Sequence, residues 1–163
     1  MFISCKDNVE KQHPGLSLPG GNHIEVKIYM LAKEDGNVKL FYGNDKDGEF
    51  SEENAVIKQI KGSNEIQRLK FNLPEGLKEP QLRLDADMVS GINLKKVRFI
   101  YGQRSIDVDG EQIFSFFRAD INKCTVSLKT GEVKPLEGSR SISLYPQAEY
   151  MKQQLKMLTH SEK

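Results

Sequence analysis

The sequence contains no tryptophan and only two cysteines, Cys5 and Cys124, among its 163 residues. Their spacing matches neither the CxxC pair of a redox centre nor the paired cysteines of a zinc site. The sequence therefore argues against a zinc site, and it leaves one disulfide or two free thiols as the alternatives.

Long apolar runs and an excess of one charge are also absent. No apolar run approaches the ~20 residues that a membrane-spanning helix needs, so we expect membrane contact only through a segment outside this chain. The 24 lysines and arginines nearly balance the 23 aspartates and glutamates, and the two signs are finely mixed. Because the net charge of +1 gives no field that favours nucleic acid or an anionic membrane, we expect no nucleic-acid partner.

The opening M-F-I-S-C-K-D-N is similar to the end of a bacterial lipoprotein signal, in which a short apolar stretch precedes the cysteine that is lipidated. No charged segment or complete apolar segment stands before Cys5 in the given sequence. Two alternatives follow: Cys5 is a lipidation site behind a shortened leader, or it is an ordinary residue of a polar terminus.

No catalytic motif is recognisable. No serine lies in a G-x-S-x-G setting, and the three histidines are His13 in the polar lead-in, His23 at a strand start and His160 in the tail. The thirteen glycines are dispersed as turn residues, so no phosphate-binding loop is predicted. Glycoside hydrolysis needs only two suitably placed carboxylates, so an enzyme acting on glycans stays an alternative.

Short segments of alternating apolar and polar residues run through most of the chain. In I-E-V-K-I-Y-M, residues 24–30, the alternation is typical of a half-buried strand. It resumes in 38–42 after a turn at Asp35-Gly36, so residues 24–42 are predicted to form a hairpin. Further strands are predicted at 55–60, 69–73, 82–86, 112–117, 124–128 and 133–136.

The segment I-N-L-K-K-V-R-F-I-Y, residues 92–101, alternates with one interruption. The apolar residues change phase between Leu94 and Val97, because Lys95 and Lys96 together take the place of one polar residue. One extra residue in a strand is what a β-bulge introduces, so we predict a bulge at these lysines.

Turn residues separate the predicted strands at intervals of about 8 to 12 residues, a spacing typical of antiparallel sandwiches. The end of the chain differs, because Pro146 suits the first turn of a helix and Met151, Leu155 and Leu158 recur at helical spacing. We therefore predict an all-β protein, an antiparallel β-sandwich of about eight to ten strands with a short C-terminal helix. The predicted organisation is an extended lead-in over 1–22, the sandwich domain over 23–145, and the helix with its tail over 146–163.

The segment L-R-L-D-A-D, residues 82–87, turns Arg83, Asp85 and Asp87 to one face of a predicted strand. One hypothesis is that Arg83 and Asp85 bind sugar hydroxyl groups and that Asp87 assists them. The alternative is that Arg83 pairs with Asp85 or with a cross-strand acid on a half-covered sheet face. The alternation alone predicts a strand and does not choose between the two.

Without tryptophan, a sugar-stacking site would depend on tyrosine or phenylalanine. Tyr29 and Phe41 fall on the polar side of their predicted strands, and Tyr101 lies at a strand end. Tyr29 is therefore a candidate ligand-binding residue, and the alternative is that these rings pack under loops or under the terminal helix. The phenylalanines of S-F-F-R, residues 115–118, are predicted to belong to the core.

The acidic loop N-D-K-D-G-E-F-S-E-E-N, residues 44–54, resembles the start of an EF-hand calcium loop. Its register fails, because Gly48 in the sixth position would put Gly43 first and Asn54 twelfth, where acidic residues are needed. A structural calcium bound by Asp45 and Asp47 is the one metal hypothesis left, and solvated turn residues are its alternative. No other cofactor is predicted.

A succession of motifs between residues 38 and 101 resembles a family of bacterial β-sandwich domains. The motifs are V-K-L-F-Y-G-N, G-E-F-S-E-E-N-A-V, I-Q-R-L-K-F-N-L-P-E-G, L-R-L-D-A-D and I-N-L-K-K-V-R-F. Such domains are similar to jelly-roll or galactose-binding-like modules, and they accompany membrane proteins and glycosyltransferases of cell-surface polysaccharide assembly. The chain departs from the family at Ala86, where the family has proline, and Asp87 is an extra residue.

The resemblance implies a jelly-roll-like sandwich that acts outside the cytoplasm, in the periplasm or at the cell surface. Its implied role is that of a non-catalytic accessory or interaction module of the cell envelope, and its implied partners are carbohydrate or another envelope protein. Two alternatives stay open because a fold does not fix a function: a protein-interaction or scaffold domain without a small ligand, and a glycan-active enzyme.

Overall fold

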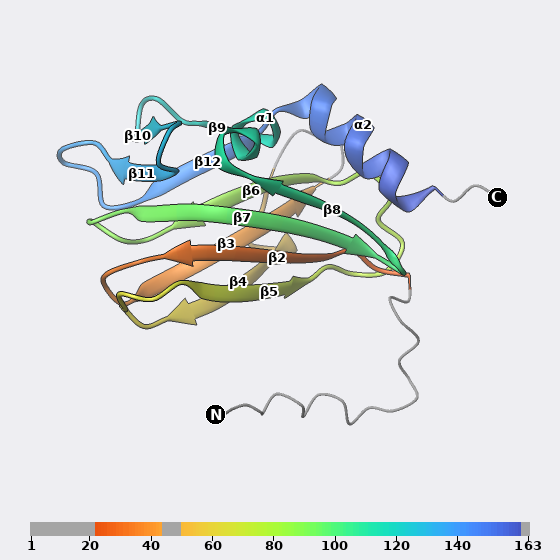
Figure 1. The fold of residues 1–163 in the computed structure, drawn as a ribbon, viewed down its shortest axis with the longest axis horizontal. Coiled ribbons are helices and arrows are strands. Elements are labelled where there is room, and N and C mark those ends of the chain that lie inside the picture. The colour runs from red at the N-terminus through yellow and green to blue at the C-terminus, as the bar shows by residue number, and fades with distance from the viewer. Residues whose placement is uncertain (1–21, 44–49, 161–163) are drawn as a thin grey trace.

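Two antiparallel β-sheets pack face to face in the computed structural model, which describes residues 22–43 and 50–160 (Figure 1). One sheet, called the β7 sheet, consists of β2 (Glu25–Leu31), β5 (Gln67–Asn72), β7 (Ile92–Tyr101), β8 (Arg104–Asp109), β10 (Cys124–Ser127) and β11 (Glu132–Pro135). The other, called the β6 sheet, consists of β3 (Gly36–Gly43), β4 (Ala55–Ile60), β6 (Gln81–Ala86), β9 (Phe117–Ala119) and β12 (Ile142–Pro146).

The strand orders place β7, β2, β6 and β3 in the interior of their sheets. The β7 sheet runs β10-β11-β7-β2-β5. Along the edge of β7 that faces away from β2, β11 pairs with residues 92–93 and β8 pairs with residues 96–101. The β6 sheet runs β4-β3-β6-β12-β9. The predicted antiparallel β-sandwich is confirmed, and the arrangement is compatible with a jelly-roll.

The core lies between the two sheets and takes every second residue of the central strands. Val26, Ile28 and Met30 of β2 are fully buried, and so are Leu82 and Leu84 of β6. Each such side chain stabilises the fold by about 1.5–3 kcal/mol through its removal from water. The residues between them point outward, so the outer faces of both sheets carry the other half of each strand, which is mostly polar.

The predicted hairpin over 24–42 is wrong. β2 pairs with β5 and β7, whereas β3 pairs with β4 and β6, so residues 32–35 carry the chain from one sheet to the other. Both strands have a buried apolar set, and two consecutive strands of a sandwich can belong to different sheets, one on each side of the core. Asp35 holds this crossing, because its Oδ1 accepts a hydrogen bond of 2.8 Å from the Gly62 N–H.

The predicted β-bulge in β7 is confirmed. Along the β2–β7 pair Tyr29 lies opposite Lys96, and the next residue, Met30, lies opposite Leu94. Lys95 is therefore the extra residue. The bulge lets both Leu94 and Val97 face the core, where they are 2% and 1% exposed.

The strand predicted at 112–117 is wrong over most of its length. This segment continues a 3₁₀ turn (Gly110–Gln112) into the short helix α1 (Ile113–Phe116), and only then does β9 begin. Ile113 and Phe116 are both buried because three residues of helix bring them onto one face. Phe116 stacks on Phe99 of β7 with ring centroids 5.0 Å apart. The predicted core position of the two phenylalanines is confirmed, since Phe117 is 1% exposed.

Two strands were not predicted at all. β8 has only Ile106 and Val108 as apolar residues, and β12 is a five-residue strand that ends in Pro146. With them, the described residues form eleven strands, more than the expected eight to ten.

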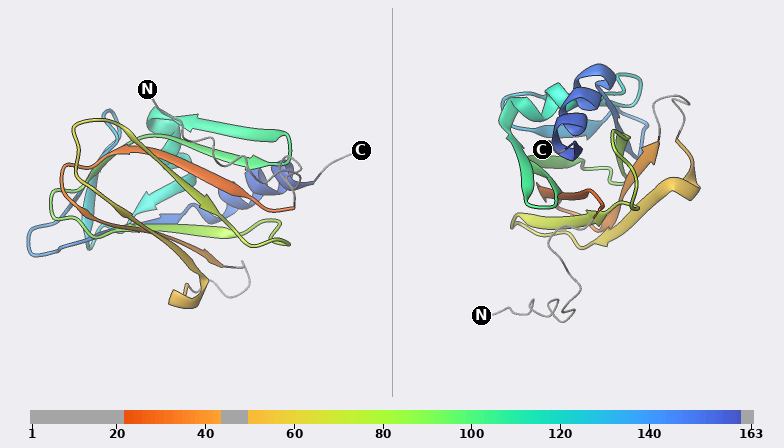
Figure 2. Two further views of the ribbon diagram at one scale, coloured as in Figure 1. Left: turned by 90° about the horizontal axis from the view of Figure 1, so that it is seen from below. Right: turned by 90° about the vertical axis from the view of Figure 1, so that its right-hand side faces the viewer.

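The C-terminal helix α2 (Ala148–Thr159) closes one side of the sandwich and contacts α1, β6, β7 and β8 (Figure 2). The helix begins after Pro146, which is the last residue of β12 and not the first of the helix. The predicted stripe of Met151, Leu155 and Leu158 is buried against the core. The short terminal helix is thus confirmed, with a slightly later start.

Arg104 of β8 fixes the far end of α2. Its guanidinium donates hydrogen bonds to the carbonyl oxygens of Met157 and His160, at 2.8 and 2.7 Å. Those carbonyls lack intrahelical partners, so a cation there also complements the negative end of the helix dipole. Among the described residues, no helix is long and apolar enough to cross a membrane.

Met151→Ala should lower the free energy of unfolding by ~2–5 kcal/mol, because the fully buried side chain would leave a cavity. The same substitution at Met157, which lies on the same helix and is 63% exposed, is the matched control. It should change the free energy of unfolding by less than about 0.5 kcal/mol. Urea denaturation measures both, and equal losses would contradict the packing of α2 against the core.

Candidate functional site

An arginine surrounded by aromatic rings lies in the middle of the outer face of the β6 sheet. Arg83 of β6 stands opposite Phe41 of β3, and the Arg83 guanidinium carbon is 4.8 Å from the ring centroids of both Phe41 and Tyr145. Phe50 contributes a third ring, 6.0 Å from the same carbon and edge-on to the other two. We call Phe41, Phe50, Arg83, Asp85 and Tyr145 the Arg83 cluster.

Asp85 holds the guanidinium of Arg83 through two hydrogen bonds. The Arg83 Nε donates to Asp85 Oδ1 at 2.9 Å and the Nη2 donates to Oδ2 at 2.7 Å, with both side chains less than a fifth exposed. The hydrogen bond to Asp85 raises the pKa of Arg83 above its ordinary value, although burial acts in the opposite direction. The pair therefore carries no net charge and keeps the rings on either side of Arg83 in fixed positions.

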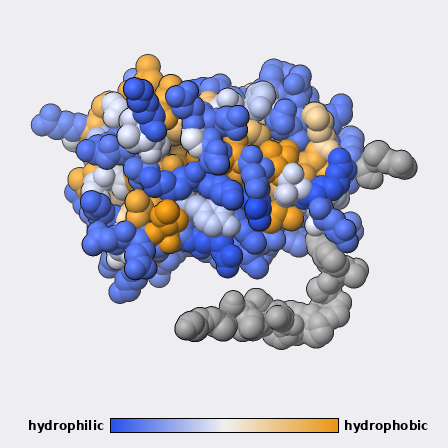
Figure 3. All heavy atoms as spheres, viewed as in Figure 1, coloured by the Kyte–Doolittle hydropathy of each residue, from blue (hydrophilic) through white to orange (hydrophobic). Residues whose placement is uncertain are grey.

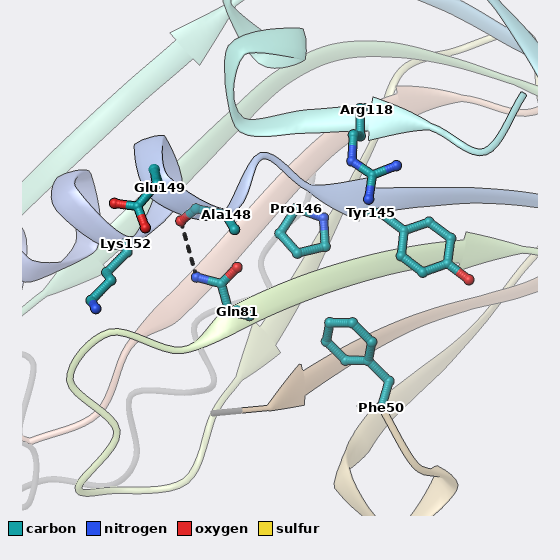
Figure 4. A pocket seen from close by; sticks show the side chains of 8 residues that line it. All are labelled: Phe50, Gln81, Arg118, Tyr145, Pro146, Ala148, Glu149 and Lys152. Atoms are coloured by element: carbon teal, nitrogen blue, oxygen red, sulfur yellow. Dashed lines mark hydrogen bonds between the residues drawn. The ribbon is translucent and has the colours of Figure 1, made fainter. Parts of the chain in front are cut away.

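A pocket of about 280 Å³ opens beside the Arg83 cluster, where β12 leads into α2 (Figure 4). We call it the Tyr145 pocket. Aromatic rings, two cations, one amide and one carboxylate line it. The lining residues are Phe50, Gln81, Arg118, Tyr145, Pro146, Ala148, Glu149 and Lys152.

The pairing of β9 with β12 brings an exposed cation to the pocket. Arg118 lies opposite Tyr145 in this pair, and its guanidinium carbon is 5.5 Å from the Tyr145 ring centroid. Within the described part of the chain, no acidic side chain lies within ion-pair distance of Arg118. Gln81 is fixed at the other side by donating a hydrogen bond of 3.3 Å to the Ala148 carbonyl. Hydrogen-bond donors and acceptors thus lie together beside a tyrosine ring.

The candidate residues predicted from the sequence do not form one site. Arg83 and Asp85 lie together, in the pairing that the structural alternative described. Asp87 follows the end of β6 and lines a separate hollow with Asp35 and Arg140. Tyr29 lies on the outer face of the β7 sheet, on the other side of the sandwich. A ligand role for each of these residues stays a prediction.

The metal prediction falls on residues that the structure does not describe, since Asp45 and Asp47 lie in the gap between residues 43 and 50. Within 22–43 and 50–160, no group of three or more histidines, cysteines, aspartates or glutamates is placed to hold a metal ion. Calcium at Asp45 and Asp47 is therefore an open prediction.

Sequence reasoning missed the main residues of the Tyr145 pocket. In I-S-L-Y-P the alternation turns Tyr145 outward, and this signal is present in the sequence, although the strand was not predicted. Arg118 carries no comparable signal, because it meets Tyr145, 27 residues further along the chain, only through the pairing of β9 with β12. Phe41 is 4% exposed beneath its neighbours, so for this ring the packing alternative applies.

Comparisons with known proteins give no relative for this chain: no family model, no curated protein and no solved structure matches it. The class that the structure establishes is therefore an antiparallel β-sandwich compatible with a jelly-roll. The finer resemblance to galactose-binding-like accessory domains has no support from a relative, and function has to be argued from the geometry of the site.

Arg83→Ala should lower the free energy of unfolding by ~1.5–3 kcal/mol, because it leaves a largely buried carboxylate without its charged hydrogen-bond donor. Arg98→Ala is the matched control, since Arg98 makes the same two-bond pair with Asp107 on the exposed outer face of the β7 sheet. Water screens and replaces exposed partners, so its loss should be clearly smaller. Chemical denaturation of both variants at one pH checks the difference, and losses of equal size would show that the rings around Arg83 add nothing to the pair.

Proposed function

We propose that the protein is a non-catalytic binding module that holds a carbohydrate in the Tyr145 pocket. The observation that carries this proposal is a half-exposed tyrosine ring that lines a pocket together with guanidinium, amide and carboxylate groups. Sugars present an apolar face of C–H groups and a rim of hydroxyls, and such a site offers a ring for the face and hydrogen-bonding groups for the rim.

The Arg83 cluster supports this role because it positions the ring before any ligand arrives. The guanidinium carbons of Arg83 and Arg118 lie 4.8 and 5.5 Å from the Tyr145 ring centroid, and the Phe50 ring packs against Tyr145 in an edge-to-face arrangement. A ring that is already fixed loses little conformational entropy on binding. Small-molecule pockets usually measure about 300–1,000 Å³. The Tyr145 pocket, at about 280 Å³, lies close to the lower end of this range and therefore suits a single sugar unit.

The chemistry of the pocket favours binding over hydrolysis. Among the described residues that line it, Glu149 is the one carboxylate, whereas glycoside hydrolysis uses two. No histidine lines the described pocket either. We therefore assign no catalytic step to it.

An accessory role outside the cytoplasm is part of the same proposal. Its support is the resemblance of the motifs between residues 38 and 101 to sandwich domains that accompany envelope polysaccharide assembly. The pocket is consistent with that setting, because glycans would be the natural ligands there. The partner is then carbohydrate, or an envelope protein that presents it.

A glycan array probed with the purified protein, in calcium and in EDTA, tests the proposal. Tyr145→Leu should weaken binding at least about tenfold, because loss of the stacked ring removes about 1.5 kcal/mol or more. Tyr145→Phe keeps the ring and should retain most of the affinity.

Tyr29→Leu is the matched control, since Tyr29 lies on the other sheet and should leave neutral glycan binding unchanged. Absence of binding in both buffers would contradict the proposal and favour a scaffold or protein-contact domain. Binding that EDTA abolishes would bring Asp45 and Asp47 into the account, and Asp45→Asn would then test the calcium prediction.

A further inference from the structure

The outer face of the β7 sheet carries rows of cations that run across its strands. Lys27 of β2 stands directly opposite Lys70 of β5 on one side and Arg98 of β7 on the other. In the next outward row Tyr29 stands between Arg68 and Lys96. We call these residues the Lys27 face: Lys27, Tyr29, Arg68, Lys70, Lys96 and Arg98.

Alternation with the core explains why all six side chains point the same way. Val26 and Ile28 of β2 are fully buried, so Lys27 and Tyr29 between and after them point outward, as do their partners in register. Figure 3 looks onto this sheet, whose strands lie in front in Figure 1, and shows hydrophilic residues over much of the face, interrupted by hydrophobic patches.

The acids of this face neutralise its rim and leave its centre positive. Asp107 of β8 accepts two hydrogen bonds from Arg98, which lower the pKa of Asp107 below its ordinary value. Glu25 lies 3.6 Å from Lys70. Within 22–43 and 50–160, Lys27 and Arg68 have no acidic side chain within ion-pair distance.

Three cations side by side do not help the sheet to form. Residues directly opposite on antiparallel strands have Cβ atoms about 4.5–5.5 Å apart, and like charges in such pairs are destabilising. The row of Lys70, Lys27, Arg98 and Asp107 contains two such contacts, and the ion pairs of Lys70 with Glu25 and of Arg98 with Asp107 offset part of the repulsion. Lys27 itself has no such acid among the described residues, so its charge is left for a negatively charged partner to pair with.

We propose that the Lys27 face binds a linear anionic polysaccharide, with carboxylates of successive sugars paired to cations of neighbouring strands. Strands lie about 4.8 Å apart, so each row offers positive charge over about 10 Å of a chain that crosses the sheet. The flat face suits an extended polymer, whereas the Tyr145 pocket suits one sugar unit. This site lies on the opposite sheet and does not rest on the function proposed for the pocket.

The observations favour a polysaccharide over nucleic acid. Single-stranded nucleic acids stack successive bases on several rings, whereas this face has one tyrosine, and the Lys96 ammonium lies 5.5 Å from its ring centroid. Nucleic-acid-binding domains are also usually strongly basic, with a pI above about 9, and this chain has a pI of about 7.7. The small net charge results from acids elsewhere and coexists with a local positive face.

Lys27→Gln gives a first test without any ligand. Removing the central charge should raise the midpoint of thermal unfolding by about 1–4 °C at low ionic strength, and added salt should shrink the gain. Lys129→Gln in the exposed turn after β10 is the matched control and should leave the midpoint unchanged. A lower midpoint for Lys27→Gln would overturn the premise that these cations repel one another.

Titration calorimetry with polygalacturonate at low salt tests the site itself. The wild-type protein should bind, and raising the salt concentration should weaken the binding. Lys27→Gln/Lys70→Gln should bind at least about tenfold more weakly, because two of the pairing cations are lost. The control Lys129→Gln/Lys156→Gln loses the same charge from exposed positions elsewhere and should bind within about twofold of wild type.

The other outcomes decide against the proposal or separate it from the pocket. No binding of polygalacturonate, equal loss in the two double variants, or tighter binding of a thymidylate oligomer or of phosphatidylserine vesicles would each overturn it. Tyr145→Leu should still bind polygalacturonate fully, so failure of the pocket as a glycan site and failure of the Lys27 face are distinguishable. Loss of polygalacturonate binding in Tyr145→Leu would overturn the assignment to the β7 sheet.

Discussion

Burial of alternate side chains between two sheets is the constraint on which the rest of the structure depends. It fixes which half of every strand is unavailable to ligands, as Val26 and Ile28 in β2 and Leu82 and Leu84 in β6 show. The other half necessarily forms two outer faces, pointing in opposite directions. Function in this protein is therefore a question of what each outer face presents, and the two faces present different chemistry.

The charged side chains of the two outer faces have different surroundings. On the β6 sheet, Arg83 is paired with Asp85 and enclosed by rings, so its charge serves to position Tyr145 beside the pocket. On the β7 sheet, Lys27 stands between two cations and its charge faces solvent without an acidic partner among the described residues. The first arrangement suits a ligand recognised by shape and stacking, and the second suits one recognised by negative charge.

The sequence predicts elements that depend on local pattern and fails where distant strands decide. Most of the strands, the bulge at Lys95 and the helical stripe of α2 follow from periodicity, and the structure confirms them, whereas the strand predicted at 112–117 is mostly helical. The hairpin over 24–42 failed because alternation cannot tell whether consecutive strands pair or face each other across a core. Alternation within one strand does place Arg83 and Asp85 on the same face, as predicted. It cannot place Arg118 beside Tyr145, because these residues meet only through the register of β9 against β12.

The central claim is that the two outer faces are separate binding surfaces. An NMR titration of ¹⁵N-labelled protein with a neutral glycan selected on the array, and then with short oligogalacturonates, tests it most directly. The neutral glycan should shift amides of β12, the start of α2 and β6 near Gln81, whereas oligogalacturonates should shift amides of β2, β5 and β7. Shifts from both ligands on the same face, or no shifts from either, would contradict the account.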